Sequence, residues 1–257
     1  MLMTIYAIGD IHGQIGMLDA ALARIEADGG DTGPGGADEV IFLGDLVDRG
    51  PAARQVLERL IAGRAEGRRW SVIRGNHDTM FLRFLRDGEL NDPAIKSGNG
   101  WTHYTLGGCA TLESYGVDTA MERPIEDLLR QAQALVPAEH RAFLESLPLY
   151  LRRPGLLFVH AGIRPGVALE DQAEQDLIWI RDDFYAEEGP LPWLVVHGHT
   201  IVSSPTHFGN RIDIDTGAGA NPTPRYLSVA AFEGTDCFIV TDEGRQPLLP
   251  PTPSRTS

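Results

Sequence analysis

The first third of the chain alternates short apolar runs with segments of helical periodicity, and this alternation constrains the fold more than any other feature. Apolar runs at residues 4–9, 40–43 and 70–73 have the length of strands, and each is followed by apolar residues at helical spacing. Strands that alternate with helices predict a parallel sheet covered by helices. Functional residues are then expected in the loops at the carboxyl ends of the strands.

The rest of the chain has a different pattern. Residues 88–147 lack strand signals and predict a helical insertion, which we expect to form one wall of a cleft. The connections between the later strands are short and favour a mixed or antiparallel sheet that faces the first one. The sequence therefore predicts an α/β fold, a sandwich of two mixed β-sheets flanked by helices. The later strands are expected at residues 156–159, 194–196, 211–214, 227–232 and 237–241.

The length of 257 residues fits one large α/β domain, which we place at residues 1–245. Residues 246–257 combine four prolines with polar residues and predict a disordered tail. The two cysteines, Cys109 and Cys237, are far apart and have no metal-type spacing, so neither a disulfide framework nor a thiolate zinc site is expected.

Composition excludes several classes of partner. No stretch approaches the ~20 apolar residues of a membrane span, and the first residues lack the features of a signal peptide. We therefore expect a cytoplasmic protein that does not bind membranes. The net charge of −14 argues against a nucleic-acid partner, because such proteins neutralise many phosphates with basic side chains. Any anionic substrate must be held by a local cationic site.

Most residues suited to metal or acid-base chemistry lie in five loops that follow apolar runs. Glycines in these loops allow the backbone to turn sharply beside a ligand. A lone aspartate or histidine after a strand is more often a helix cap or a satisfied polar residue, but five such loops in order favour a shared site. The loops are GDIHG at 9–13, GDLVDRG at 44–50, RGNHD at 74–78, FVHAG at 158–162 and VHGHT at 196–200.

Histidines and carboxylates without thiolates suit a divalent metal such as Mn, Fe or Zn, and we favour Mn. The number of donors predicts two ions. Two ions about 3.5 to 4 Å apart can bind phosphate oxygens and lower the pKa of a bridging water until it becomes a nucleophile. The expected ligands are Asp10, His12 and Asp45 for one ion, and Asp45, Asn76, His160 and His199 for the other, with Asp45 bridging.

Phosphate transfer also needs positive charge and a proton for the leaving oxygen. Arg49 and Arg74 lie inside the motifs, where they can clamp phosphate oxygens. Arg181 is a third predicted phosphate contact, although its acidic neighbours also allow a surface ion pair. His77 is expected to donate the proton, with Asp48 fixing its tautomer.

Taken together, the loops resemble the calcineurin-like metallophosphoesterases, specifically the bacterial and phage type of phosphoprotein phosphatase, with its GDxHG, GDxVDRG and RGNHE-type signatures. The motifs span residues 9–200. The resemblance implies a two-sheet sandwich, a dinuclear metal site and direct attack of a metal-activated hydroxide on phosphorus. By motif position it implies the same ligands, the same acid pair and the same phosphate contacts as above.

The chain departs from the signatures of this family at three places. Asp78 stands where eukaryotic members show glutamate, a change common in bacterial relatives. Ile201 stands where the wider superfamily often has a final histidine, which weakens the case for a third nitrogen ligand on the first metal. His197 matches no role in the family, and a hydrogen-bonded neighbour of the site is the favoured interpretation.

Three functions follow, in order of preference. The first is a metal-dependent phosphomonoesterase, a serine/threonine protein phosphatase acting on a phosphoprotein or phosphopeptide. The second is a bis(5'-nucleosyl)-tetraphosphatase with a nucleotide substrate: that related branch shares HAGI at 160–163 but looks like GDLVARGP and LGNHD, whereas Asp48 and Arg74 match the protein phosphatases. The third is an inactive phosphate-binding scaffold, against which the predicted acid pair argues.

Overall fold

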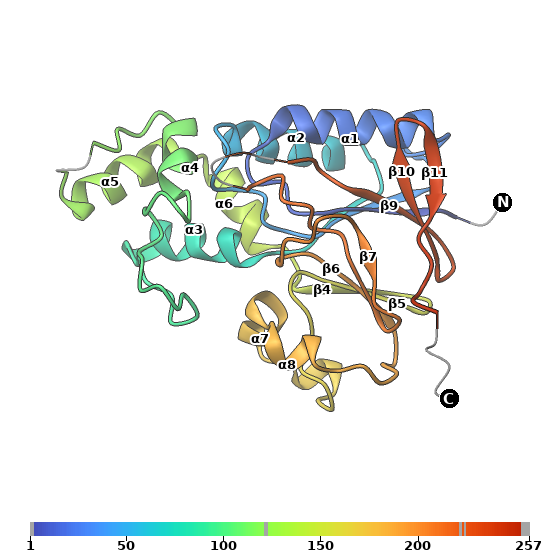
Figure 1. Cartoon of the computed structure of the whole chain (residues 1–257). Helices are drawn as coiled ribbons and strands as arrows, with labels where there is room; N and C mark the ends of the chain where they lie inside the picture. Colours follow the sequence, from blue (N-terminus) through green and yellow to red (C-terminus); the bar gives the residue numbers. More distant parts are fainter. Residues whose placement is uncertain (1–2, 121–122, 221–222, 224, 253–257) are drawn as a thin grey trace.

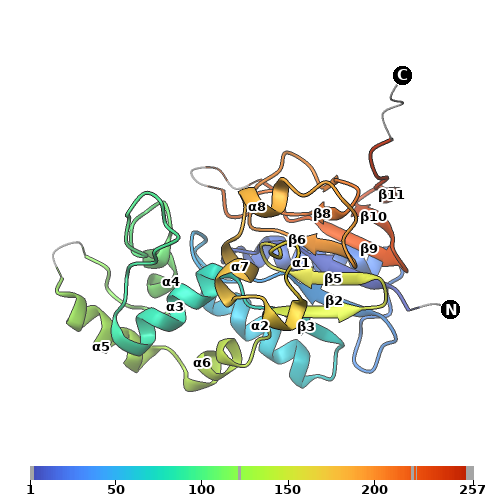
Figure 2. The same ribbon diagram turned by 90° about the horizontal axis from the view of Figure 1, so that it is seen from below.

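The computed structural model describes residues 3–120, 123–220, 223 and 225–252. Two sheets pack face to face, and helices cover their outer faces (Figure 1). Seen from below, α7 and α8 lie over the second sheet, with α1 and α2 on the far side of the molecule (Figure 2). The predicted α/β sandwich with two mixed sheets is confirmed.

The first sheet has the order β11-β10-β9-β1-β2-β3. One half of it is parallel, because β1, β2 and β3 follow one another through the helices α1 (Ile15–Ala27) and α2 (Ala53–Ala65). β9 adds antiparallel to β1, and Ile5 pairs with Phe232. The strands are β1 Ile5–Ile8, β2 Glu39–Phe42, β3 Trp70–Val72, β9 Val229–Glu233, β10 Asp236–Thr241 and β11 Gly244–Pro247.

The second sheet has the order β4-β5-β6-β8-β7. Its three central strands are parallel, and an antiparallel strand closes each edge. The parallel centre brings the carboxyl ends of β5 and β6 to the same edge. The strands are β4 Tyr150–Arg153, β5 Leu156–Val159, β6 Leu194–His197, β7 Thr206–His207 and β8 Arg211–Asp213.

Side chains alternate between the two faces of each strand and so separate three hydrophobic clusters. Ile5 and Ala7 of β1 pack between the sheets with Phe158. Tyr6 and Ile8 point instead to the helical side of the first sheet. Burial on both faces explains why these strands read as continuous apolar runs in the sequence.

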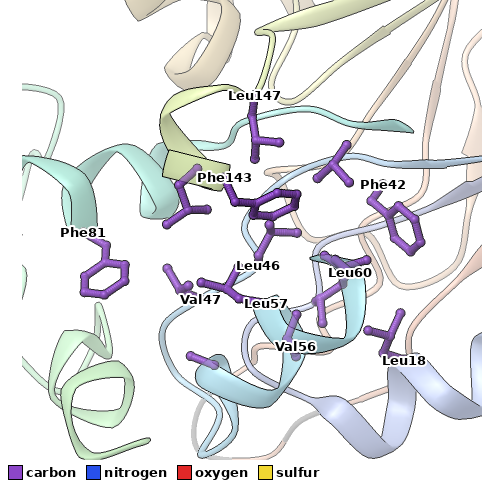
Figure 3. Close-up of a cluster of buried hydrophobic side chains, with 14 of the residues drawn as sticks. Leu18, Phe42, Leu46, Val47, Val56, Leu57, Leu60, Phe81, Phe143 and Leu147 are labelled. Atoms are coloured by element: carbon purple, nitrogen blue, oxygen red, sulfur yellow. The ribbon is translucent and has the colours of Figure 1, made fainter. Parts of the chain in front are cut away.

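Three helices follow the parallel strands, and the insertion packs on two of them. In Figure 3, Phe143 and Leu147 of the insertion lie with Leu57 of α2 and Phe81 of α3 in one buried cluster. A short 3-10 turn, Leu169–Asp171, precedes α7. The helices are α1 Ile15–Ala27, α2 Ala53–Ala65, α3 Asn76–Asp87, α4 Gly108–Ser114, α5 Ile125–Leu135, α6 Ala138–Glu145, α7 Glu174–Trp179 and α8 Asp182–Tyr185.

The structure corrects the sequence-based placement of the last strands. We expected residues 227–232 and 237–241 in the second sheet, but β9 and β10 extend the first sheet beside β1. Pairing also continues past residue 245, because β11 ends at Pro247. The remaining tail is described to residue 252, and residues 253–257 of the predicted tail lie outside the described part.

Within the described ranges, no helix combines the length and apolar character needed to span a membrane.

Candidate metal centre and active site

The predicted loops converge at one edge of the sandwich because they follow strands of the parallel halves of both sheets. Asp10 follows β1 and Asp45 follows β2, while His160 follows β5 and His199 follows β6. Asp10, Asp45 and His160 are buried, and His199 is partly buried. The two sheets therefore each contribute donors to a single buried site.

Backbone conformation marks the same site. Among the described residues, all non-glycine residues with a positive φ belong to the predicted set. L-residues rarely adopt this left-handed region, and such strain concentrates at functional sites. The loops are thus held in shapes that local sequence preference alone does not favour. The residues are His12, Asp45, Asp48, Arg49 and His199, with φ between 46° and 72°.

Two buried triads share Asp45. In each triad the donor atoms lie within 4.8 Å of one another: His12, Asp45 and His77 in one, and Asp45, His160 and His199 in the other. Oδ2 of Asp45 faces Nε2 of His12 at 3.5 Å, and Oδ1 faces Nε2 of His160 at 3.4 Å. One carboxylate thus presents a different oxygen to each triad, an arrangement that allows it to bridge two cations.

Several candidate metal-ligand atoms face one another with no hydrogen between them. Nδ1 of His12 and Nδ1 of His160 bond to the carbonyls of Val47 at 2.9 Å and Leu43 at 2.8 Å, so these nitrogens carry the protons. Each Nε2 then presents a lone pair to Asp45, and Nε2 of His160 lies 2.9 Å from Oδ1 of Asn76. Acceptors that face acceptors in a buried site are consistent with a cation bound between them.

Two further buried atoms point to the same conclusion. Oδ1 of Asp10 and Nε2 of His199 have no hydrogen-bond partner among the described residues. Leaving such atoms unsatisfied is costly, and both atoms lie beside the triads, where a cation would satisfy them. The other oxygen of Asp10 accepts the backbone N–H of His199 at 3.1 Å, which holds both residues in place.

Burial sets the charge state of the donors. It lowers the pKa of His160 to about 4 and of His12 well below its ordinary value, because a buried imidazolium is poorly solvated. The same effect raises the pKa of Asp10 and Asp45. The histidines are therefore neutral near pH 7, which is the form that ligates metals.

Asp48 and His77 form the expected pair. Nδ1 of His77 donates to Oδ2 of Asp48 at 2.7 Å, and both residues are buried. Trp101 Nε1 donates to the same oxygen and Thr111 Oγ1 to the other, each at 2.7 Å. Burial raises the pKa of Asp48 to about 7, while these two hydrogen bonds oppose the rise. The helical segment after α3, which contains Trp101 and Thr111, therefore holds the Asp48 carboxylate in place.

Asp78 has a structural role next to the Asp48–His77 pair. Its Oδ1 accepts the N–H of Leu46 at 2.9 Å, and its Oδ2 accepts the N–H of Gly75 at 3.0 Å. Gly75 must be a glycine, because a Cβ there would meet Oδ1 of Asp45 at 2.2 Å. Asp78 thus joins two ligand loops, and the departure from glutamate leaves Asn76 and His77 in place.

The three predicted phosphate contacts separate in the structure. Arg49 and Arg181 line a cavity of about 310 Å³ over the triads. Arg49 Nη2 donates to Nε2 of His77 at 3.1 Å. Arg74 is not among the lining residues: its guanidinium lies 3.4 Å from Glu174 of α7. The structure therefore brings two of the three arginines to the site.

Sequence reasoning missed Asp215, Lys96 and Trp179. Asp215 is buried behind Gly198, where a Cβ would lie 3.4 Å from the Cβ of Asp215. A signal existed, because Asp215 and Gly217 follow β8 as the acidic and glycine residues follow the other strands. Lys96 and Trp179 line the cavity but belong to no recognisable motif.

His197 lies behind the site. Its Nδ1 donates to the carbonyl of Gly198 at 3.1 Å, and its ring packs against Phe184 and Tyr185. The side chain is fully buried, and burial lowers its pKa to about 3.

Comparison with solved structures supports the fold. The chain is similar to a crystal structure provisionally identified as a diadenosine tetraphosphatase, with a TM-score of 0.65, 20% identity, and coverage of 96% of this chain and 95% of that one. It is also similar to the cold-active protein-tyrosine phosphatase of a psychrophilic Shewanella, with a TM-score of 0.59, 16% identity, and coverage of 97% and 81%.

Sequence comparison finds curated relatives over most of the chain. The chain is 27% identical over 195 residues to bis(5'-nucleosyl)-tetraphosphatase PrpE [asymmetrical] of Bacillus subtilis, covering 69% of this chain and 70% of the relative. It is 26% identical over 263 residues to the PrpE protein of Halalkalibacterium halodurans, covering 94% of each.

A family model also matches most of the chain. The calcineurin-like phosphoesterase model matches residues 3–216, which include all the ligand loops. The chain therefore belongs to the calcineurin-like phosphoesterase family.

Proposed function

We propose that the protein hydrolyses bis(5'-nucleosyl) polyphosphates, with diadenosine tetraphosphate as the representative substrate. The observation that carries this proposal is the run of PrpE relatives that align over most of the chain. The cavity over the triads is lined by two arginines and a lysine, which suits a ligand with several phosphates. This proposal exchanges the order of the first two functions predicted from the sequence.

The proposed metal ligands follow from the triads. Asp10, His12 and Asp45 would hold one divalent cation; Asp45, Asn76, His160 and His199 would hold the other. When bound, the two cations would polarise phosphate oxygens and lower the pKa of water. His77 is close enough to His12 and Asp45 to complete the first triad, but its Nδ1 is engaged by Asp48, so we assign it a different part.

The chain supplies charge and a proton carrier beside the cations. Arg49 and Arg181 face the cavity and would neutralise the oxygens of the attacked phosphate. Nε2 of His77 accepts a hydrogen bond from Arg49, so this atom lies beside one of the arginines that would bind the phosphate. Nε2 carries no proton in this arrangement, and burial lowers the pKa of His77 to about 3. With Nδ1 held by Asp48, Nε2 is the atom that would take up a proton and pass it to the leaving oxygen.

A second candidate is hydrolysis of phosphoserine or phosphothreonine, and the Asp48–His77 pair is the observation that favours it. A nucleotide leaves as a phosphate, whose second pKa is about 6, and needs little help from an acid. A serine alkoxide is far more basic and requires a proton as it leaves. An inactive scaffold would have no use for this pair, so we rank that function last.

Comparing the turnover of two substrates tests which of the two functions the protein has. The protein is loaded with Mn²⁺, and kcat/KM is measured for diadenosine tetraphosphate and for a phosphoserine peptide, with metal-free protein as the control. We expect the dinucleotide to be preferred by at least about tenfold. Preference for the peptide would overturn the proposal and restore the protein phosphatase function. Chromatography of the products shows whether cleavage yields two ADP or AMP with ATP.

A further inference from the structure

A second cavity continues outward from the catalytic one. The inner cavity has a volume of about 310 Å³ and the outer one about 450 Å³. They share the residues Ala94, Lys96, Trp179 and Arg181. One side of this groove is a loop of the insertion and the other is the segment of α7 and α8. A ligand longer than one phosphate ester can therefore extend from the inner cavity into the outer one.

Charge divides the groove into two parts. The inner cavity and the boundary hold cationic side chains, Arg49, Lys96 and Arg181. The outer end holds acidic ones, among them Asp176 and Asp183. Phosphates are therefore favoured near the triads, whereas the outer end favours an uncharged group that donates hydrogen bonds.

The one arginine that lines only the outer cavity is already engaged. Arg164 binds Asp176 through Nε at 2.8 Å and Nη2 at 2.6 Å, and it binds Asp183 through Nη1 at 2.7 Å. Its charge is balanced by these two carboxylates. Arg164 therefore holds together the side chains that line the outer cavity, and it is not available to bind a phosphate.

Lys96 stands at the boundary with little to hold it. It is the only lysine in the sequence. Its ammonium lies 3.8 Å from Asp182, and both side chains are 88% exposed. An ion pair of this kind contributes little, so a phosphate can take the place of Asp182 at small cost.

Trp179 supplies an aromatic surface at the same boundary. It lines both cavities, and its ring meets that of His199 edge to face at 5.7 Å between centroids. The outer cavity also contains Pro93 and Ile180. A flat ring with a polar edge fits aromatic and apolar surroundings that open onto carboxylates.

We propose that the outer cavity is the subsite for the distal nucleoside of a dinucleoside polyphosphate, and that Lys96 binds the phosphates between the two ends. This inference rests on the proposed function and adds the part of the molecule that recognises the second nucleoside. At the outer end, the carboxylate lone pairs of Asp176 and Asp183 that Arg164 leaves free accept hydrogen bonds from the ribose and the base. The inner arginines and Lys96 follow the phosphate chain.

The first test compares a long and a short substrate. kcat/KM is measured with Mn²⁺ for diadenosine tetraphosphate and for p-nitrophenyl phosphate in the wild type, Lys96→Gln, Lys96→Arg and Gln175→Ala. Gln175 lines the outer cavity and not the inner one. We expect Lys96→Gln to lower the ratio of the two values about tenfold, mainly through KM, as for the loss of one charge-assisted contact. Lys96→Arg should recover most of it, and Gln175→Ala should lower it about threefold. Arg130→Gln, an exposed charge change on α5, is the matched control.

The outcomes separate the two proposals. If the wild type cleaves diadenosine tetraphosphate and the ratio is the same in every variant, the subsite is wrong and the function stands. If the wild type does not cleave it, the function fails and the subsite fails with it. If Lys96→Gln instead raises turnover of a basic phosphopeptide without altering the dinucleotide, the groove binds peptides and the subsite is wrong.

Because the chain has a single lysine, chemical labelling gives a second readout. Acetylation of Lys96 by an amine-reactive ester is followed by mass spectrometry in the wild type, with the dinucleotide in large excess and before an appreciable share of it is hydrolysed. We expect diadenosine tetraphosphate to slow the labelling of Lys96 at least about fivefold, and inorganic phosphate to slow it much less. Equal labelling rates with and without the dinucleotide would overturn the assignment of Lys96.

Discussion

The ligand loops around Asp45 and the outer wall of the groove, residues 93–96 with 175–183, are held in different ways. The ligand loops are buried, their histidines bond to backbone carbonyls, and several residues have a positive φ. The outer wall is partly exposed, and ion pairs such as Lys96 with Asp182 connect its side chains. Rigid loops suit chemistry that depends on geometry, whereas an adaptable wall suits the choice of substrate.

The largest loss of metal binding and activity is expected at Asp45, the buried residue that both triads share. Asp45→Asn removes a charge that both triads share, and even changes beyond the ligands cost about 10- to 100-fold in metal affinity. We expect fewer than two ions per chain and a loss of kcat/KM above about 1,000-fold. Metal analysis by mass spectrometry provides the measurement.

Asp92→Asn is the matched control for this change. Asp92 is also buried, but it pairs with Arg83 away from the triads. This variant should keep both ions even if it loses stability. If Asp45→Asn binds two ions as well as the control does, Asp45 is not a shared ligand.

His77→Asn tests the acid pair and should have the next largest effect. For a phosphoserine peptide, which has a poor leaving group, kcat should fall about 100-fold. For p-nitrophenyl phosphate, whose leaving group needs no proton, the loss should stay below about tenfold. Metal content should change little. Equal losses for the two substrates would refute the part given to Nε2 of His77.

Trp101→Phe asks whether the insertion supports the chemistry. It removes one of the three side-chain donors to Asp48, the others being His77 and Thr111, and leaves a buried oxygen partly unsatisfied. The free energy of unfolding should fall by about 1–3 kcal/mol. kcat for the phosphoserine peptide should fall about tenfold, and less for p-nitrophenyl phosphate.

A control separates stability from positioning. Phe81→Leu changes a ring that stacks on Trp101 and leaves the donor in place. It should reduce stability without changing the dependence on the leaving group. If both variants alter kinetics alike, the bond from Trp101 has no special part.

The smallest effect is expected at Arg74. Its guanidinium faces Glu174 and does not line the inner cavity, so Arg74→Ala should lower kcat/KM by less than about threefold. The matched change Arg49→Ala should cost more than about tenfold, because Arg49 lines the cavity beside His77. Steady-state kinetics on one substrate compares them. Similar losses in the two variants would mean that Arg74 turns into the site when substrate binds.

The sequence predicted the features that recur along the chain, the polar loops after strands. It missed the features that depend on contacts between residues far apart in the chain. Loops after strands identified the donors near Asp45, because the ends of parallel strands meet at one edge. The same rule applied to Asp215 would have found it. The apolar pattern at residues 227–232 identified a strand but not its partner, since pairing with β1 joins residues far apart in the chain.

Side-chain direction was the second limit. Position in a motif does not decide where a long arginine points, and Arg74 and Arg49 point to different partners. From sequence alone, a tryptophan such as Trp101 is most simply interpreted as a core residue. Trp101 does belong to the core, and it also donates to Asp48.

If Asp45 joins two cations in one site, anomalous diffraction from crystals grown with Mn²⁺ should show both of them. We expect two peaks about 3.5 to 4 Å apart, one on each side of the Asp45 carboxylate. A single peak, or two peaks of which only one contacts Asp45, would contradict it.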